Sequence, residues 1–147
     1  MIRVTRRYRF CASHRLHSEE LPEAENQAIY GKCNNPFGHG HNYVLDISVR
    51  GPLDPDTGQA VHRGALDRLV ERNILEVLDH RNLNTEIEAF RRVVPTSENL
   101  GLEIYRRLRD DWRSEFAGPW PVLEKIRIAE TDRNIFKITD ETRQGRR

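Results

Sequence analysis

Two stretches of the chain alternate apolar and polar residues, which is the period of a half-buried β-strand. The first covers residues 2–12, where the even positions are apolar and only Arg6 breaks the alternation. The second covers residues 41–49, where the odd positions are apolar. A turn-rich segment with two glycines and two prolines follows at residues 51–58. The pattern therefore predicts two strands, the second of which ends at this turn.

Two other stretches have apolar residues at helical spacing, which predicts amphipathic helices that lie on the sheet. The first covers residues 63–78. The second follows Pro95, where Thr96 or Ser97 can cap the helix and Glu98 suits the positive end of the helix dipole. Its buried stripe consists of Leu100, Ile104, Leu108 and Trp112.

Residues 123–131 and 134–139 have the composition of two further strands, joined in a hairpin by Asp132 and Arg133. The resulting order is β-β-α-α-β-β. It predicts the α+β class, with an antiparallel four-stranded sheet and two helices on one face. No repeat or linker divides the chain, so we expect residues 1–147 to form a single domain.

Composition and charge narrow the functional classes. The 147 residues include 24 basic and 23 acidic side chains, and the net charge of +1 leaves no excess for coating nucleic acid or an anionic membrane. The longest window without charge, residues 33–45, is too short to span a bilayer. Two cysteines cannot build a disulfide framework, and the first residues lack the apolar stretch of a signal peptide. We expect a cytoplasmic protein, and the low mean hydropathy of -0.76 favours burial against sister subunits.

Three histidines are aimed at the apolar side of the predicted sheet. His39 and His41 continue the odd-numbered apolar series, and His14 continues the even-numbered series of the first strand. Buried neutral imidazoles need partners, and a Zn²⁺ ion with three protein nitrogens and an open fourth position would supply one to all three. A single histidine on an apolar face is more often a hydrogen-bonded core residue. The coincidence of three favours a metal site.

Three further residues are candidates for acid/base chemistry. Cys33 lies in a polar loop beside Lys32, where a neighbouring cation or metal lowers the pKa of a thiol. The alternative for Cys33 is a small buried hydrophobe. Asp79 and His80 follow the first predicted helix and can form an oriented acid/base pair, although such a polar run is also typical of a helix end. The residues alone leave these alternatives open.

Glu130 shares its parity with Ile126 and Ile128, so the alternation aims its carboxylate at the apolar side, where it needs a donor-rich partner. Two adjacent N–H groups on the guanidine-like edge of a heterocycle would match both of its oxygens. The alternative is a strand-end bulge that turns Glu130 to solvent. For Glu98, the alternative is a simple first-turn carboxylate.

Five segments of the chain resemble the 6-pyruvoyl-tetrahydropterin synthase family, in the family's order and over nearly the whole chain. The segments are FCASHRL (10–16), GKCNNPFGHGHNY (31–43), LDHRNLN (78–84), PTSEN (95–99) and ETDRNI (130–135). The resemblance implies a tunnelling fold, in which three subunits close their sheets into a barrel and two trimers stack into a homohexamer with active sites between subunits. One departure is Cys11, which stands where the family more often has Ser.

The resemblance also implies a role for individual residues. His14, His39 and His41 would be zinc ligands, Cys33 the proton acceptor, Asp79 and His80 its partner acid/base pair, and Glu130 the pterin anchor. Thr96, Ser97 and Glu98 fall in the family's second pterin-contacting segment. Arg15, Lys32 and Lys137 lie near these motifs and are candidates for binding a triphosphate.

The implied reaction converts 7,8-dihydroneopterin triphosphate into 6-pyruvoyl-tetrahydropterin with loss of triphosphate, which is a phosphorus–oxygen lyase reaction without an external redox cofactor. The related 6-carboxy-tetrahydropterin synthases of queuosine biosynthesis share the fold, the zinc triad and the substrate. They tend to have three residues between the cysteine and the His-Gly-His motif, where this chain has five, residues 34–38. The longer loop favours the pyruvoyl enzyme. A zinc- and pterin-binding module without catalysis is a third alternative.

Overall fold

A computed structural model describes residues 1–140 of the protein. The strands are β1 (Ile2–His14), β2 (His39–Gly51), β3 (Arg81–Asn82), β4 (Val122–Ala129) and β5 (Ile135–Thr139). The α-helices are α1 (Glu23–Tyr30), α2 (Arg63–Val70), α3 (Glu76–Leu78), α4 (Leu83–Glu86) and α5 (Ser97–Glu115). Turns of 3₁₀-helix lie at Gly31–Asn34 and Glu88–Phe90, and a π-helical segment, Glu71–Leu75, joins α2 to α3. Residues 141–147 of the predicted domain lie outside the described range.

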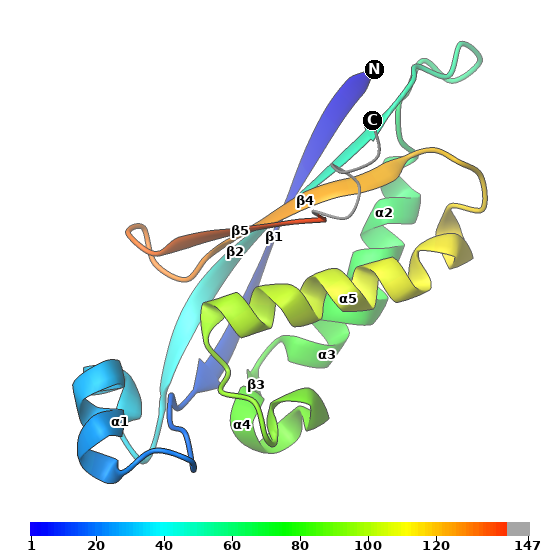
Figure 1. Ribbon diagram of the computed structural model, residues 1–147. Coiled ribbons are helices and arrows are strands. Elements are labelled where there is room, and N and C mark those ends of the chain that lie inside the picture. Colours follow the sequence, from blue (N-terminus) through cyan, green and yellow to red (C-terminus); the bar gives the residue numbers. More distant parts are fainter. Residues whose placement is uncertain (141–147) are drawn as a thin grey trace.

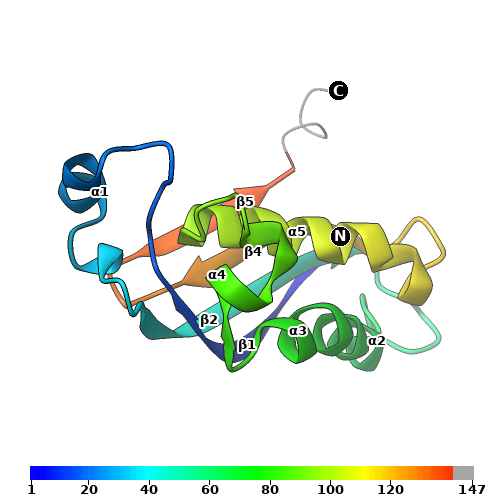
Figure 2. The same ribbon diagram turned by 90° about the horizontal axis from the view of Figure 1, so that it is seen from below.

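The strands form one sheet in the order β3-β1-β2-β4-β5, and helices α2 to α5 lie over one face of it (Figure 1, Figure 2). The predicted α+β class is confirmed, but the prediction of four antiparallel strands is wrong because the sheet has a fifth strand. This strand, β3, pairs in parallel with Ala12 and Ser13 of β1. Two residues are too few to produce an alternation of apolar and polar positions, so the sequence pattern could not reveal it.

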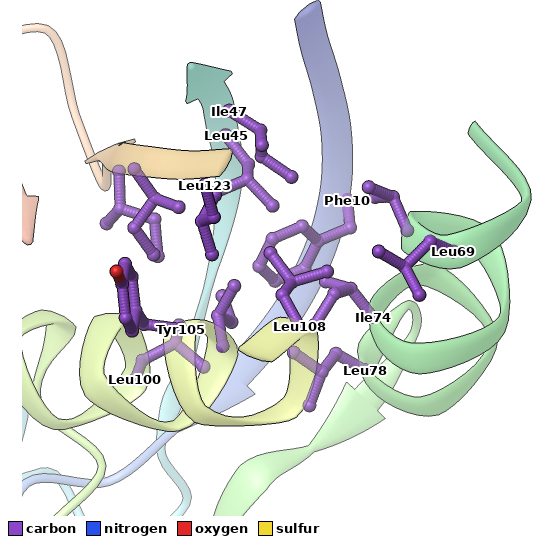
Figure 3. Close-up of a cluster of buried hydrophobic side chains, with 14 of the residues drawn as sticks. Phe10, Leu45, Ile47, Leu69, Ile74, Leu78, Leu100, Tyr105, Leu108 and Leu123 are labelled. Carbon is purple, nitrogen blue, oxygen red and sulfur yellow. The ribbon is translucent and has the colours of Figure 1, made fainter. Parts of the chain in front are cut away.

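The apolar faces of the sheet and of the helices meet in one core (Figure 3). Phe10 of β1 and Leu45 of β2 lie on the same side of the sheet as Leu69 of α2 and Leu108 of α5. Side chains two residues apart on a strand share a face, so the alternation of β1 and β2 directs one full set of side chains into this core. The packing fixes both long strands, and their ends carry the three histidines.

The two predicted helices are present, and one of them is irregular. The helix predicted for residues 63–78 consists of α2, the π-helical segment and α3. The second predicted helix is α5, and Thr96 caps it by accepting a hydrogen bond from the Asn99 amide. Helix α5 therefore begins at Ser97, after the Thr96 cap, as the capping pattern predicts.

Helix α1 has no counterpart among the predicted elements. Asn26 is its only buried residue, so the helix lacks an apolar stripe. The Asn26 side chain instead accepts a hydrogen bond from the Ser18 amide and donates to the carbonyl oxygens of Ser18 and Leu21. The chain then returns to the sheet, where the Leu16 amide donates to the Cys33 carbonyl at 2.8 Å. The connection between β1 and β2 is thus folded against the end of the sheet that carries the histidines (Figure 1).

The face of the sheet opposite the helices carries charged and polar side chains. Asp46 is 6% exposed there and accepts hydrogen bonds from Arg7 at 2.7 Å and from Arg127 at 3.4 Å. Strand β5 pairs only with β4, and the outer edge of β1 pairs only with the two residues of β3. Within residues 1–140, a polar sheet face and two strand edges are therefore left uncovered. No helix of this range has the length and the apolar character needed to cross a membrane.

Candidate metal centre and active site

The ends of β1 and β2 bring three histidines together. Antiparallel pairing places His14 opposite His39 and Ala12 opposite His41. The ring centroids of the three histidines lie 4.6 to 5.0 Å apart, and each pair meets close to edge-on. This is the convergence that the parity of the two strands predicts.

Hydrogen bonding determines which ring nitrogen of His14 is available to an ion. His14 is fully buried, and its Nδ1 lies 2.8 Å from the carbonyl oxygen of Pro95. A carbonyl oxygen can only accept, so Nδ1 carries the proton and Nε2 keeps its lone pair. Burial lowers the pKa of His14 to about 4, so the ring is neutral at neutral pH. Its Nε2 is buried without a hydrogen-bond partner, as expected of a metal ligand whose other nitrogen donates to a carbonyl.

Glu130 joins the histidines from the end of β4. Its Oε1 lies 2.9 Å from His41 Nε2, in a direction that makes no hydrogen bond, and its Oε2 accepts a hydrogen bond from the Ser97 hydroxyl at 2.6 Å. Burial lowers the pKa of His41, and the charge of Glu130 acts in the opposite direction. The Glu130 side chain is 11% exposed, so it faces the apolar side as its parity predicts and not the solvent.

The donor set fits a zinc ion. One ligand atom from each of four residues lies within 4.8 Å of the other three, and the residues are His14, His39, His41 and Glu130. Neutral imidazole nitrogens and carboxylate oxygens are both zinc ligands. A buried ring nitrogen without a partner is unfavourable, and both His14 and His41 have such an Nε2 atom. Three imidazoles would therefore hold the ion, with Glu130 as either a fourth ligand or a neighbour.

Cys33 lies within electrostatic reach of this group, and its pKa differs from the expectation. Burial raises the pKa of the thiol above its ordinary value, and the negative charge of Glu130 raises it further. Lys32, which was expected to lower this pKa, is exposed and does not contribute to the shift. The described chain alone therefore keeps Cys33 protonated at neutral pH, and a positive charge near Glu130 is required to make it a base.

Asp79 and His80 are bound to the backbone of β1 at Cys11. The Cys11 amide donates to Asp79 Oδ1 at 2.9 Å, and the Cys11 carbonyl accepts from the His80 amide at 2.6 Å. His80 has a φ of 59° and a side chain that is 80% exposed, with Nε2 3.6 Å from Asp79 Oδ2. These contacts hold the pair at a fixed place on the sheet, with the imidazole turned outward.

His80 borders a hollow of about 460 Å³. The hollow is also lined by residues 11–13 of β1 and residues 40–42 of β2, among them His41. Cys11, Ser13 and Asn42 have the opposite parity to the three histidines, so their side chains lie on the other face of the β1–β2 pair. In residues 1–140, no hydrogen bond or ion pair joins Asp79 or His80 to Cys33, Glu130 or the histidines. Within the described chain, the acid/base pair is therefore not in direct polar contact with the candidate metal centre.

The segment of Thr96, Ser97 and Glu98 contributes one contact to the centre. Ser97 is buried and donates to Glu130. The Thr96 hydroxyl caps α5, and Glu98 is exposed and lines a hollow between α5 and β5. Ser97 is therefore the member of this segment that is in place to act with Glu130.

The three candidate cations for a triphosphate lie apart from one another. Arg15 lines a hollow next to Gly38 and Pro95, and its Nε donates to the Asn34 carbonyl at 3.1 Å. Lys32 is exposed in the loop before β2, and Lys137 lines the hollow along β5. Of the three, Arg15 lies nearest the candidate metal centre in this sense, because it lines the same hollow as Pro95, whose carbonyl oxygen contacts His14.

Comparison with known proteins identifies the family. A family model described as 6-pyruvoyl tetrahydropterin synthase matches residues 3–141. The chain belongs to this family. It is 44% identical over 132 residues to the 6-pyruvoyl tetrahydrobiopterin synthase of Poecilia reticulata, and 42% identical over 132 residues to that of Homo sapiens. These alignments cover 90% of this chain and 86% and 87% of the two relatives. The solved 6-pyruvoyl tetrahydropterin synthase of Caenorhabditis elegans has a TM-score of 0.85 and 40% identity, covering 95% of this chain and 96% of that one.

The sequence of this 6-pyruvoyl tetrahydropterin synthase family member did not predict two contacts of the candidate centre. Pro95 contributes only a backbone carbonyl, which leaves no signal in the residue type. Tyr43 belongs to the odd-numbered apolar series, but its hydroxyl lies 3.4 Å from His14 Nδ1. A buried tyrosine hydroxyl needs a polar partner, and this requirement is the signal that could have placed Tyr43 near the histidines.

Proposed function

We propose that the protein is a zinc-dependent lyase that converts 7,8-dihydroneopterin triphosphate into 6-pyruvoyl-tetrahydropterin and releases triphosphate. The observation that carries the proposal is the convergence of three histidines and Glu130, whose ligand atoms all lie within 4.8 Å of one another. The names of the relatives support the same reaction, because the chain is 44% identical to a 6-pyruvoyl tetrahydrobiopterin synthase.

We assign a separate step of the reaction to each group of residues in the candidate site. Zinc held by His14, His39 and His41 would supply Lewis acidity to the side-chain hydroxyls of the substrate, which makes the adjacent carbons more acidic. Cys33 accepts a carbon-bound proton at Sγ, and the His80 imidazole, oriented by Asp79, exchanges the second proton. Fixed placement of these groups around the bound substrate supplies the rest of the rate enhancement.

Glu130 is the proposed anchor of the pterin ring and not a zinc ligand. Each carboxylate oxygen has two lone pairs, so Oε2 can accept from Ser97 and from a ring N–H at the same time. Glu130→Gln separates the two roles. We expect this variant to keep about one zinc per chain by elemental analysis and to lose pterin binding, because the amide cannot accept from two N–H groups. Loss of the zinc would instead make Glu130 a ligand.

We further propose a homohexamer of two trimers, with each active site shared between subunits. An uncovered strand edge is a template for pairing with another chain, and closing sheets into a barrel removes such edges. The exposed edges of β1 and β5 and the polar sheet face support this assembly. The separation of His80 from Cys33 within one chain supports a site that takes the two residues from different subunits. A cytoplasmic location is also proposed, because Cys11 and Cys33 are free thiols.

The proposed reaction is tested by incubating the purified protein with 7,8-dihydroneopterin triphosphate. The expected result is zinc-dependent release of triphosphate and a product with the mass of 6-pyruvoyl-tetrahydropterin. Cys33→Ala is expected to abolish turnover, whereas Cys11→Ser serves as the matched thiol control and retains it. A pterin product with a carboxyl group at position 6, formed together with free acetaldehyde, would assign the protein to the 6-carboxy-tetrahydropterin synthases. Pterin binding without turnover by the wild type would make it a binding module.

A further inference from the structure

Cys33, the proposed proton acceptor, lies in a short 3₁₀ turn and not in a strand or an α-helix. Such turns are short and have poorer hydrogen-bond geometry than an α-helix, so they do not fix a side chain by themselves. Removal of a proton from carbon needs the base at a defined place, and a displacement of about 1 Å can cost on the order of a hundredfold in rate. The position of Cys33 relative to the histidines must therefore be set by contacts with other parts of the chain.

The segment that follows His14 supplies these contacts. The Leu16 amide donates to the Cys33 carbonyl oxygen at 2.8 Å, and Arg15 Nε donates to the Asn34 carbonyl oxygen at 3.1 Å. The Asn34 side chain adds a bond in the opposite direction, since its Nδ2 donates to the Leu16 carbonyl oxygen at 2.8 Å. Both backbone groups of Leu16 are thus bonded to residues 33 and 34. These bonds tie Cys33 to the chain that carries a proposed zinc ligand.

The side-chain amide of Asn34 fits this place in one orientation. Asn34 is 4% exposed, and its Nδ2 has a second contact, with His17 Nδ1 at 3.0 Å. An amide nitrogen only donates, so its two protons point to Leu16 and His17, and His17 Nδ1 accepts. Turning the amide over would bring its oxygen against the Leu16 carbonyl oxygen, and two acceptors cannot bond. The amide is therefore locked, and neither of its protons remains for a substrate.

We propose that Asn34 is a positioning residue that holds Cys33 at its place beside the histidines. The inference rests on the proposed function and adds to it the residue on which the placement of the base depends. With both amide protons used within the chain, Asn34 acts through Cys33 and takes no part in proton transfer. Asn34 is also the member of this group that a substitution can test, because Arg15 is a candidate for binding the triphosphate and the Leu16 bonds use its backbone.

Asn34→Ala tests this role, and Asn26→Ala is its matched control. Asn26 is also buried, and its Nδ2 also donates to backbone carbonyl oxygens, those of Ser18 and Leu21. Within residues 1–140, no hydrogen bond of the Asn26 side chain reaches Cys33 or Asn34. Both variants therefore lose the same kind of bond in the connection between β1 and β2. Steady-state release of triphosphate and zinc content are measured for both variants and for the wild type.

For Asn34→Ala we expect kcat to fall by about 10- to 100-fold while KM stays within about twofold, because the substrate still binds but meets a misplaced base. Its zinc content is expected to match the wild type, because the strands and the Pro95 carbonyl still hold the histidines. For Asn26→Ala we expect a kcat within about twofold of the wild type. A general loss of stability would instead lower both rates alike.

Alkylation of Cys33 gives a readout that does not depend on turnover. The rate of reaction with iodoacetamide is measured at one pH on Cys11→Ser, so that Cys33 is the remaining thiol. We expect Asn34→Ala to raise this rate by about threefold or more, because the thiol leaves its partly buried place, and Asn26→Ala to leave it unchanged. Asn34→Leu fills a similar volume without a donor and is expected to repeat the changes of Asn34→Ala, which a role in packing alone would not produce. It also carries the test if Asn34→Ala does not fold.

Three results would overturn the inference, and they differ from failure of the proposed function. An unchanged kcat or an unchanged alkylation rate in Asn34→Ala would show that Asn34 does not place Cys33. An equal fall of kcat in Asn26→Ala would assign the effect to the stability of the whole connection. Loss of zinc from Asn34→Ala would show that Asn34 supports the histidines and not Cys33. A wild type without turnover overturns the proposed function, and the inference with it.

Discussion

Gly38 allows the loop before β2 to lie directly against the end of β1. Its φ is 72°, and a Cβ atom at this position would lie 2.9 Å from the backbone oxygen of His14. Any larger residue therefore meets both an unfavourable backbone conformation and a contact with the backbone of His14, a proposed metal ligand. Because His39 follows directly, a shift of Gly38 also moves this second proposed ligand.

We predict that Gly38→Ala weakens zinc binding by about tenfold or more, because relieving the contact with the His14 carbonyl oxygen and a backbone strain on the order of 1–2 kcal/mol displaces the backbone of His14 and His39. Gly58 is the matched control, because its φ is 71° and, among residues 1–140, no atom lies within 4 Å of the place that a Cβ atom would take. Gly58→Ala carries the same strain without the contact and is expected to leave zinc affinity unchanged. Competition with a chromophoric chelator measures both variants, and equal affinities would contradict the prediction.

The pKa of Cys33 gives a second prediction for a single residue. Burial and Glu130 raise this pKa above the ordinary value of 9.0, so the thiolate is expected only at high pH in the metal-free protein. Zinc near Glu130 offsets the negative charge and should shift the appearance of the thiolate to lower pH. The rate of alkylation by iodoacetamide against pH, measured on Cys11→Ser so that Cys33 is the remaining thiol, follows this change. Identical profiles with and without zinc would contradict the prediction that zinc lowers the pKa of Cys33.

At the scale of elements, length and regular burial decide what the sequence reveals. Strands β1 and β2 and helix α5 each bury a long periodic set of side chains, so their patterns predict them. Helix α1 buries only Asn26, and β3 has only two residues, so neither produces a period. Helix α1 depends on the side-chain hydrogen bonds of Asn26 and β3 on its pairing with β1, and a pattern of hydropathy records neither.

The candidate site likewise contains some features that the sequence pattern predicts and others that it does not. Strand parity alone places His14, His39, His41 and Glu130 toward one side, and the structure brings these four together. The hydroxyl of Tyr43 and the carbonyl of Pro95 join the centre through contacts between distant elements. The pKa of Cys33 also depends on such a contact, because Glu130 is far away in sequence but close in space. The alternation pattern therefore predicts which side chains converge, whereas the hydrogen bonds around them can be found only from the three-dimensional structure.

Asp46 gives a prediction for the pairing of β1, β2 and β4. Hydrogen bonds from Arg7 hold the pKa of Asp46 below its ordinary value of 3.8, and Arg127 adds to the effect. A carboxyl group with a lowered pKa stabilises the fold above its unfolded pKa and loses this contribution as the pH falls through the folded value. We expect Asp46→Asn to lower the free energy of unfolding by about 1–2 kcal/mol at pH 7, reduced from the value for a fully buried pair because the Arg7 side chain is 52% exposed.

Urea unfolding at several pH values checks this prediction. The difference between wild type and Asp46→Asn should be constant from pH 7 to about pH 5 and should shrink as the pH falls below about 4. Ser48→Ala is the matched control on the same face of β2, since it removes a neutral hydrogen bond to Thr5 and gives no such pH dependence. A difference that persists unchanged at low pH would show that the charge of Asp46 does not stabilise the sheet.

At the scale of the whole molecule, the functional groups lie on two sides of the β1–β2 pair. Cys33 and Glu130 accompany the histidines, whereas His80 is 80% exposed beside the opposite sheet face. In the proposed assembly, this exposed imidazole, held by the backbone of β1, would act in the site of a neighbouring chain. The uncovered edges of β1 and β5 provide the means of bringing that chain into position.

Mixing two inactive variants tests this arrangement. Cys33→Ala and His80→Ala are each expected to be inactive, but their co-assembly in equal amounts should recover about a quarter of the wild-type activity. The fraction follows because a working site needs an intact Cys33 from one subunit and an intact His80 from its neighbour, each present with a probability of about one half. Each variant reassembled alone is the control. If the mixed assembly stays inactive, each site draws both residues from the same chain.

The alignment of β1 with β2 makes the histidines sensitive to errors in folding. His14 faces His39 across the pair, and a slip of one residue would turn a whole strand over, so that His39 and His41 would leave His14 on the opposite surface. A misaligned hairpin could not gather the three imidazoles around one ion. Zinc added to a refolding buffer should therefore bind and stabilise only chains with the native strand register. The yield of correctly refolded protein should rise with the zinc concentration.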